Sequence, residues 1–363
     1  MEILTKPIRF LLFLILLSVV LYFGQEVLVP FCFAALLSML FLPLCRKFES
    51  WRISRGFASL ICVIIFIAAI AIILALLSWQ VYDLSKDLSG IEQQIKQYIA
   101  RARDFLSEQF GITEQQQDKL IEKQQSSGGS KVPGLVTGVM GSFMNFFVNF
   151  ILVLVYMFLL LFLRAHIRKF VLRLTSRGDQ AKSESAMDKA THVAQKYLAG
   201  MAMMIASLWV LYSIGFSIVG VKHAIFFAIL CGLLEIVPFV GNITGTTVTI
   251  IATLAQGGDV NTIIGIVIVY GLVQFLQTYI LEPLVVGAEV NINPLSTILI
   301  IVIGESLWGI AGMILAIPLL GIAKIICDHV DGLKPYGFLI GEEKKSKTNI
   351  KDKIVKLFSK KDK

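Results

Sequence analysis

Charged residues are scarce in this chain: only 16% of its 363 residues are Asp, Glu, Lys or Arg, while 56% are hydrophobic. A soluble domain of this length would need far more polar surface. The sequence also lacks a GxxxxGK[ST] phosphate-binding loop, the motif that would support direct nucleotide hydrolysis. The composition therefore argues against a soluble domain and against a nucleotide-driven pump.

Cysteine and histidine are also few, and neither is arranged for chemistry. The five cysteines lie in or beside apolar stretches, with no CxxC pair and no histidines at metal-ligand spacing. No grouping of nucleophile, base and orienting residue is visible either. We expect no disulfide framework, no metal site, no cofactor and no enzymatic activity.

Long charge-free apolar runs dominate the rest of the chain. A helix needs about 20 apolar residues to cross the hydrocarbon layer of a membrane, and six runs approach or exceed that length. They are residues 27–45, 56–82, 132–163, 197–221, 236–258 and 260–281. The predicted fold is an all-α polytopic integral membrane protein with about eight transmembrane helices, or six if the two interrupted segments described below are re-entrant hairpins.

A shorter apolar run, from Phe10 to Gln25, follows Lys6 and Arg9. It could be mistaken for a signal peptide, but no small-x-small cleavage site follows it and a second span begins within a few residues. We therefore expect an uncleaved helical hairpin formed by the first two spans.

The positive charge is concentrated in three patches. Residues 46–55 carry +3, residues 164–196 carry +5 and residues 342–363 carry +5, whereas residues 81–131 carry −1. Basic residues next to spans remain on the cytoplasmic side. The patches predict cytoplasmic amino and carboxyl termini and an external insert, and because they flank spans they give no reason to expect a nucleic-acid partner.

These features divide the chain into six parts. They are amino-terminal transmembrane helices (1–80), an extracytoplasmic helical insert with its linker (81–131), a fourth span (132–163), a cytoplasmic amphipathic hairpin lying against the membrane surface (164–196), a carboxyl-terminal transmembrane transport core (197–330) and a basic cytoplasmic tail (331–363).

The insert has an apolar stripe at steps of three and four residues, typical of a helix that buries one face. A lone helix would expose this stripe to water, so it must pack on something. It could fold back on the weakly apolar piece 113–125 or meet the same stripe in other subunits, which we favour. The predicted contact residues are Leu84, Leu88, Ile91, Ile95 and Tyr98.

Two acids interrupt apolar segments in the carboxyl-terminal half. Glu235 stands within residues 224–258 and Glu305 within residues 296–323. A charged side chain at the bilayer centre costs at least about 2.5 kcal/mol, so such residues normally face a partner or a wet cavity. Each acid is thus a candidate for the transport pathway, with a capping or packing role as the alternative.

Helix breakers and amides surround these acids. Transporters often place their sites where two interrupted helices meet, because unwound backbone and helix ends can hold ions or polar solutes. The further pathway candidates are Pro238, Gly241, Asn242, Gln274, Gln277, Glu282, Gly309, Gly312 and Pro318.

Four motifs stand out in this half: residues 234–241 (LEIVPFVG), 282–287 (EPLVVG), 293–295 (NPL) and 307–319 (LWGIAGMILAIPL). Together they resemble the autoinducer-2 exporter (AI-2E) family of bacterial membrane proteins. The resemblance covers nearly the whole chain and implies a permease of the bacterial cytoplasmic (inner) membrane that forms homo-oligomers. Some relatives are associated with autoinducer-2 export, others with exchange of sodium or lithium for protons. Asn242 and Asn293 depart from the family pattern, in which proline and histidine are frequent at these positions.

The sequence thus predicts a transporter in a lipid bilayer that exports a small polar solute or exchanges a monovalent cation for protons. Glu235 is expected to be its protonatable or cation-binding carboxylate, with Glu305 as a possible counterpart. Two alternatives remain open: an oligomeric channel, which would transport without saturation, and a membrane scaffold or receptor that binds partners through its external helix.

Overall fold

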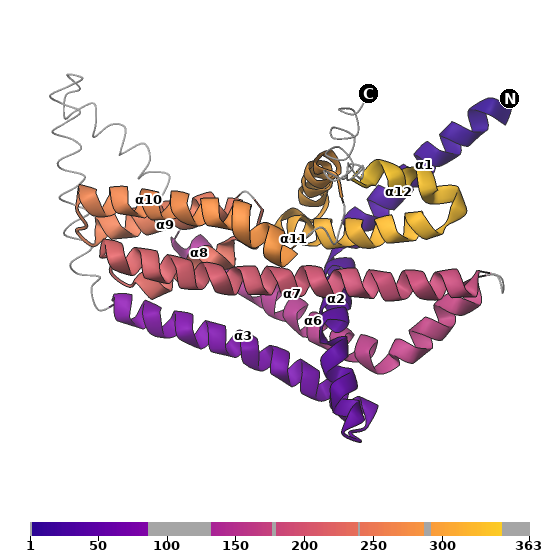
Figure 1. The fold of residues 1–363 in the computed structure, drawn as a ribbon, viewed down its shortest axis with the longest axis horizontal. Coiled ribbons are helices and arrows are strands. Elements are labelled where there is room, and N and C mark those ends of the chain that lie inside the picture. Colours follow the sequence, from indigo (N-terminus) through magenta and orange to yellow (C-terminus); the bar gives the residue numbers. More distant parts are fainter. Residues whose placement is uncertain (1, 86–131, 176–178, 239, 287–291, 343–363) are drawn as a thin grey trace, which may run out of the picture.

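The computed structural model describes residues 2–85, 132–175, 179–238, 240–286 and 292–342. These residues are almost entirely helical (Figure 1). The α-helices are α1 (Glu2–Phe23), α2 (Gln25–Ser50), α3 (Arg55–Ser85), α6 (Val132–Leu174), α7 (Gln180–Val219), α8 (Ala224–Leu234), α9 (Val240–Ala255), α10 (Val260–Leu276), α11 (Pro294–His329) and α12 (Lys334–Ile340). A π-helix, η1 (Gln277–Val286), follows α10, and a 3-10 turn, η3 (Asp331–Leu333), follows α11.

The predicted all-α membrane architecture is confirmed. By length and composition alone, six helices of the described residues could cross a membrane: α2, α3, residues 146–174 of α6, α7, residues 260–282, and α11. Shorter apolar helices lie at residues 11–23, 224–234 and 240–255. Side chains on the outside of these helices are largely apolar, as a lipid-facing surface requires.

The first two helices do not form the expected hairpin. The amide of Gly24 donates to the Val20 carbonyl, and the amide of Leu28 donates to the Gly24 carbonyl, both at 2.9 Å. These bonds continue the helical pattern through the junction, so α1 runs into α2 with a bend rather than a reversal (Figure 1). The expectation was wrong because Gly24 extends the ladder of hydrogen bonds instead of ending it.

Helix α7 is the central element of the fold. It contacts α2, α6, α8, α10, η1 and α11. The carboxyl-terminal half of α7 joins α8 and α10 in an apolar core that includes Tyr212, Phe216, Phe227 and Ile266. A second core joins α2, α3 and α6 around Met157. The two bundles are linked where α2, α7 and α11 bury Leu36, Ala194 and Leu315 together.

Candidate functional site

Glu235 lies where the first interrupted segment breaks. Helix α8 ends at Leu234 and α9 begins at Val240, so a tight turn separates two short helices that pack on each other. Pro238 has no amide hydrogen to continue the α8 ladder. Gly241 brings α9 so close to α8 that a Cβ there would lie 1.7 Å from the Leu234 carbonyl oxygen. The predicted helix breakers therefore build a hairpin with an acid at its tip.

The Glu235 carboxylate meets amides from a distant part of the chain. Gln277 Nε2 donates to Glu235 Oε1 at 2.8 Å. Gln274 Nε2 lies 3.2 Å from Gln277 Oε1 and donates more weakly to the Tyr212 hydroxyl, at 3.5 Å. Gln277 starts the π-helical segment, a wider turn that is frequent at functional sites. Three predicted pathway residues, Glu235, Gln274 and Gln277, thus form one hydrogen-bonded cluster with Tyr212.

The cluster leaves hydrogen-bonding capacity unused. Glu235 Oε2 and Asn242 Oδ1 are both buried, and neither has a hydrogen-bond partner within the described residues. Leaving such atoms unpaired in a low-dielectric interior costs about 1–3 kcal/mol each. The site is therefore poised to accept a proton, a cation, water or a polar solute.

The second interrupted segment also reverses direction. Gly309 has φ 58° and ψ −140°, a conformation that favours glycine. A Cβ on Gly312 would lie 1.9 Å from the Gly304 carbonyl oxygen, so the two halves of α11 lie against each other. Val237 of the first hairpin packs against Ile301 and Met313 of the second. The two interrupted segments therefore touch through Val237, at the break of the first, and residues along the two arms of the second.

The other predicted residues occupy different places. Glu305 is exposed on the first half of α11, and nothing in the described residues links it to the Glu235 cluster. Glu282 is exposed on η1 and interacts electrostatically with Glu235. Pro318 is buried in the second half of α11. Asn293 caps α11, because its Oδ1 accepts from the Ser296 amide at 2.7 Å.

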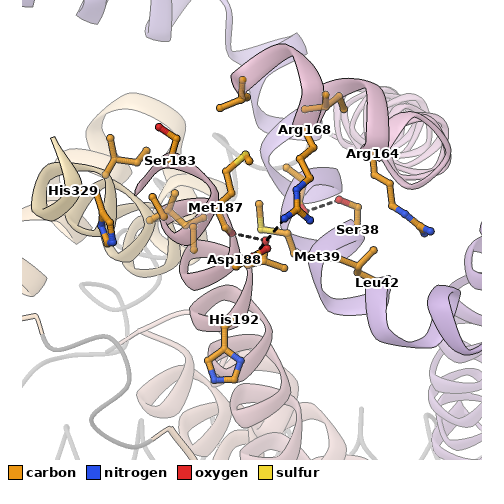
Figure 2. A pocket seen from close by; sticks show the side chains of 18 of the residues that line it. Ser38, Met39, Leu42, Arg164, Arg168, Ser183, Met187, Asp188, His192 and His329 are labelled. Atoms are coloured by element: carbon orange, nitrogen blue, oxygen red, sulfur yellow. Dashed lines mark hydrogen bonds and ion pairs between the residues drawn. The ribbon is translucent and has the colours of Figure 1, made fainter. Parts of the chain in front are cut away.

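A cavity of ≈ 1100 Å³ lies between α2, α6, the start of α7 and the end of α11 (Figure 2). Met39 and Leu42 of α2 contribute apolar walls, and Arg168, Asp188 and His192 contribute polar ones. The predicted amphipathic hairpin supplies much of the lining, because its two pieces are extensions of α6 and α7. The lining also includes Arg46, Arg164 and Lys182, which belong to the basic patches that the sequence predicts to be cytoplasmic.

The charges around the cavity are largely paired. Arg168 lies between Glu184 and, at 3.6 Å, Asp188. Asp331 pairs with Lys334 and Lys182 at 2.6 and 3.7 Å. The hydrogen bond from Lys334, followed by its charge, lowers the pKa of Asp331, so the carboxylate stays ionised at neutral pH. The result is a cavity of nearly balanced charge whose walls are more apolar than polar.

Sequence reasoning missed this cavity and a row of polar side chains on α9. The cavity depends on the packing of four segments far apart in the chain, which no local pattern reveals. The α9 row could have been found, because Thr246, Thr249 and Thr253 recur at helical spacing.

Comparison with known proteins identifies the family. Residues 11–332 match a family model whose description is "AI-2E family transporter". YrrI of Bacillus subtilis is 22% identical over 347 residues, which cover 90% of this chain and 98% of YrrI. YueF of the same organism is 30% identical over 128 residues (35% of this chain, 34% of YueF), and YhhT of Escherichia coli is 27% identical over 159 residues (43% and 45%). Each of the three is named a "putative transport protein". The chain therefore belongs to the AI-2E family of membrane transporters.

Proposed function

We propose that this protein is a permease that moves a small polar solute across the bacterial cytoplasmic membrane, coupled to a proton or monovalent cation at Glu235. One observation carries the proposal: Glu235 stands at the break between α8 and α9, where one carboxylate oxygen accepts from Gln277 and the other, also buried, has no hydrogen-bond partner among the described residues. A carboxylate in that setting can bind and release a cation at little structural cost.

The cavity supports a solute path on the predicted cytoplasmic side. It is lined by both polar and apolar groups, and its charged side chains are mostly engaged with one another. A small polar molecule can enter such a space without competing with a strong field of either sign. Export of a signalling molecule such as autoinducer-2, or exchange of sodium or lithium for protons, are the two forms of transport that the family resemblance suggests.

The test is flux in proteoliposomes. The purified protein is reconstituted, a pH gradient is imposed, and candidate solutes together with sodium and lithium are followed. We expect Glu235→Gln to abolish pH-dependent flux while preserving insertion and thermal stability, because the amide keeps the shape but cannot exchange a proton. Glu26→Gln, an exposed acid in the first turn of α2, serves as the matched control and should leave flux unchanged.

Two results would contradict the proposal. Undiminished flux in Glu235→Gln would remove this carboxylate from the mechanism. Non-saturating flux, insensitive to the pH gradient, would instead support the channel alternative.

A further inference from the structure

Polar side chains line one face of α9 and the turn residue that follows it, between the Glu235 cluster and the far end of the hairpin; all are buried except one, Asn242, which is half-buried. We call this set the polar row. Successive members are four, three, four and three residues apart, which places them on one helical face. The members are Asn242, Thr246, Thr249, Thr253 and Gln256.

The polar row has hydrogen-bonding atoms that no described residue satisfies. Thr246, Thr253 and Gln256 are 8%, 5% and 8% exposed, so each residue is more than nine-tenths buried. Thr246 Oγ1, Thr253 Oγ1 and Gln256 Oε1 have no hydrogen-bond partner in the part of the chain that the structure describes. A polar atom buried in this way requires water or a ligand.

Simple packing does not account for the row. Hydroxyl side chains in apolar helices ordinarily donate back to the carbonyl four residues earlier. Thr249 does so toward Gly245 at 2.8 Å, and Ser207 and Ser306 do so in other helices at 2.9 Å. Thr246 and Thr253 do not, although they lie on the same helix as Thr249. Their hydroxyls are therefore available to something other than the α9 backbone.

The spacing suits water. With a rise of about 1.5 Å per residue, successive members lie about 4.5–6 Å apart along the axis. That is too far for a direct hydrogen bond, but one water molecule with two bonds of about 2.8 Å spans the gap. Helix α9 packs closely on α8 near the middle of the row, because a Cβ on Gly245 would lie 3.0 Å from Cys231 Sγ.

The ends of the row give it a direction. At one end, Asn242 follows Gly241, whose Cβ position would lie 2.8 Å from the Glu235 amide nitrogen. At the other end, exposed Lys222 donates to the Gln256 carbonyl at 3.2 Å. This outer end lies on the same side of the molecule as the end of α3 and the start of α6, which flank the predicted external insert (Figure 1).

We propose that the polar row holds a file of water molecules that connects Glu235 to the extracytoplasmic side and carries protons to and from its carboxylate. In each step a hydrogen-bonded oxygen receives one proton and releases another to its neighbour, so no net chemistry occurs along the file. The proposal deepens the proposed function by assigning a proton route that is separate from the cavity, and it rests on that function for the role of Glu235.

The first test detects the water directly. Hydroxyl radicals made by X-ray radiolysis oxidise side chains that adjoin bound water, and mass spectrometry locates the products. Cys231 Sγ lies 3.6 Å from Thr249 Oγ1, whereas Cys62 lies in the core of α2, α3 and α6, where its neighbour Cys45 is already engaged by Arg164; Cys231 and Cys62 are 2% and 0% exposed. We expect Cys231 to be oxidised several times faster than Cys62. Equal protection of the two thiols would overturn the proposal.

Variants of the row sharpen this test. Replacing Thr246 and Thr253 together by valine keeps their shape but removes the hydroxyls, so Cys231 oxidation should fall to the Cys62 level. The matched serine double variant should retain the wild-type rate. Thr247→Val, on the exposed side of α9, is the control and should change nothing. Oxidation of Cys231 that is insensitive to the valine pair would contradict a file along this face.

The second test follows the proton. In infrared spectra of the acidified protein, the carboxyl band of Glu235 is identified by its loss in Glu235→Gln, and its shift after transfer to deuterated water is timed. We expect the valine pair to slow this shift about tenfold, the consequence of losing roughly one hydrogen bond of stabilisation. An unchanged rate, or no assignable band, would overturn the proton route. Neither result depends on the flux measurement that decides the proposed function.

Discussion

At the residue scale, the reversal within α11 depends on two glycines with different tasks. Gly309 supplies a positive φ of 58°, with nothing within 4 Å of its Cβ position, so backbone conformation alone requires glycine there. Gly312 has ordinary helical geometry but lies against Gly304 of the other half. Close approach of the two backbones lets this hairpin present Ile301 and Met313 to Val237 near the Glu235 turn.

Substitution of Gly312 should therefore damage the site from a distance. A methyl group there would lie 1.9 Å from the Gly304 carbonyl oxygen, and overpacking of this kind costs typically about 1–3 kcal/mol. We expect Gly312→Ala to lower the thermal unfolding temperature in detergent and to reduce flux. Gly271→Ala is the control, because nothing lies within 4 Å of that Cβ position in α10, and alanine there favours the helix. Equal stability of the two variants would show that the halves of α11 do not pack closely.

At the element scale, α7 joins the two parts of the proposed mechanism. Its start lines the cavity with Ala186, Met187 and Thr191, and its outer half carries Tyr212, which hydrogen-bonds with Gln274 of the Glu235 cluster. Helix α7 thus extends from the cavity to the apolar core that contacts the Glu235 cluster.

Filling the cavity from α7 tests whether solute passes through it. Ala186 lines the cavity, whereas its neighbour Ser185 is exposed and does not contribute to the lining. We expect Ala186→Trp to reduce the maximal flux several-fold, because the indole occupies space that the solute needs, while Ser185→Trp leaves flux near wild type. Both proteins should unfold at similar temperatures. If the two variants transport equally well, the cavity is not part of the path.

At the scale of the whole molecule, the elements were more predictable than their partners. Charge-free length predicted the long apolar helices α2, α3, α6, α7 and α10, and helix breakers predicted both interrupted segments, since these properties are local. The run 236–258 is instead a turn followed by the shorter helix α9. The bond between Gln277 and Glu235 joins residues 42 positions apart and follows from how α10 packs against the α8–α9 hairpin. The bend at Gly24 escaped prediction for a different reason: glycine followed by polar residues is compatible with a turn and with a continuing helix. Glu305 remains a predicted pathway residue without a structural partner among the described residues.

Burial also differs across the molecule. In the most apolar stretch of α11, 39% of the residues are buried inside the chain, compared with 11% in the corresponding stretches of α3 and α6. Helix α11, whose two halves pack on each other, is therefore the most buried of the six, whereas α3 presents its apolar surface outward. That surface is available to lipid or to another copy of the chain, and α3 leads directly into the insert with the predicted contact stripe.

The stripe gives the last prediction, which concerns assembly. Of its members, Leu88, Ile91, Ile95 and Tyr98 lie outside the described residues, and the side chain of Leu84 is not described, so oligomerisation remains a prediction from the sequence. We expect Leu88→Lys combined with Ile95→Lys to convert the protein to monomers in native mass spectrometry, because two charges in an apolar contact cannot be desolvated cheaply. Gln93→Lys combined with Gln97→Lys adds the same charge off the stripe and should preserve the oligomer. A wild-type monomer, or oligomers that survive the stripe variant, would instead favour a stripe that folds back on residues 113–125 of its own chain.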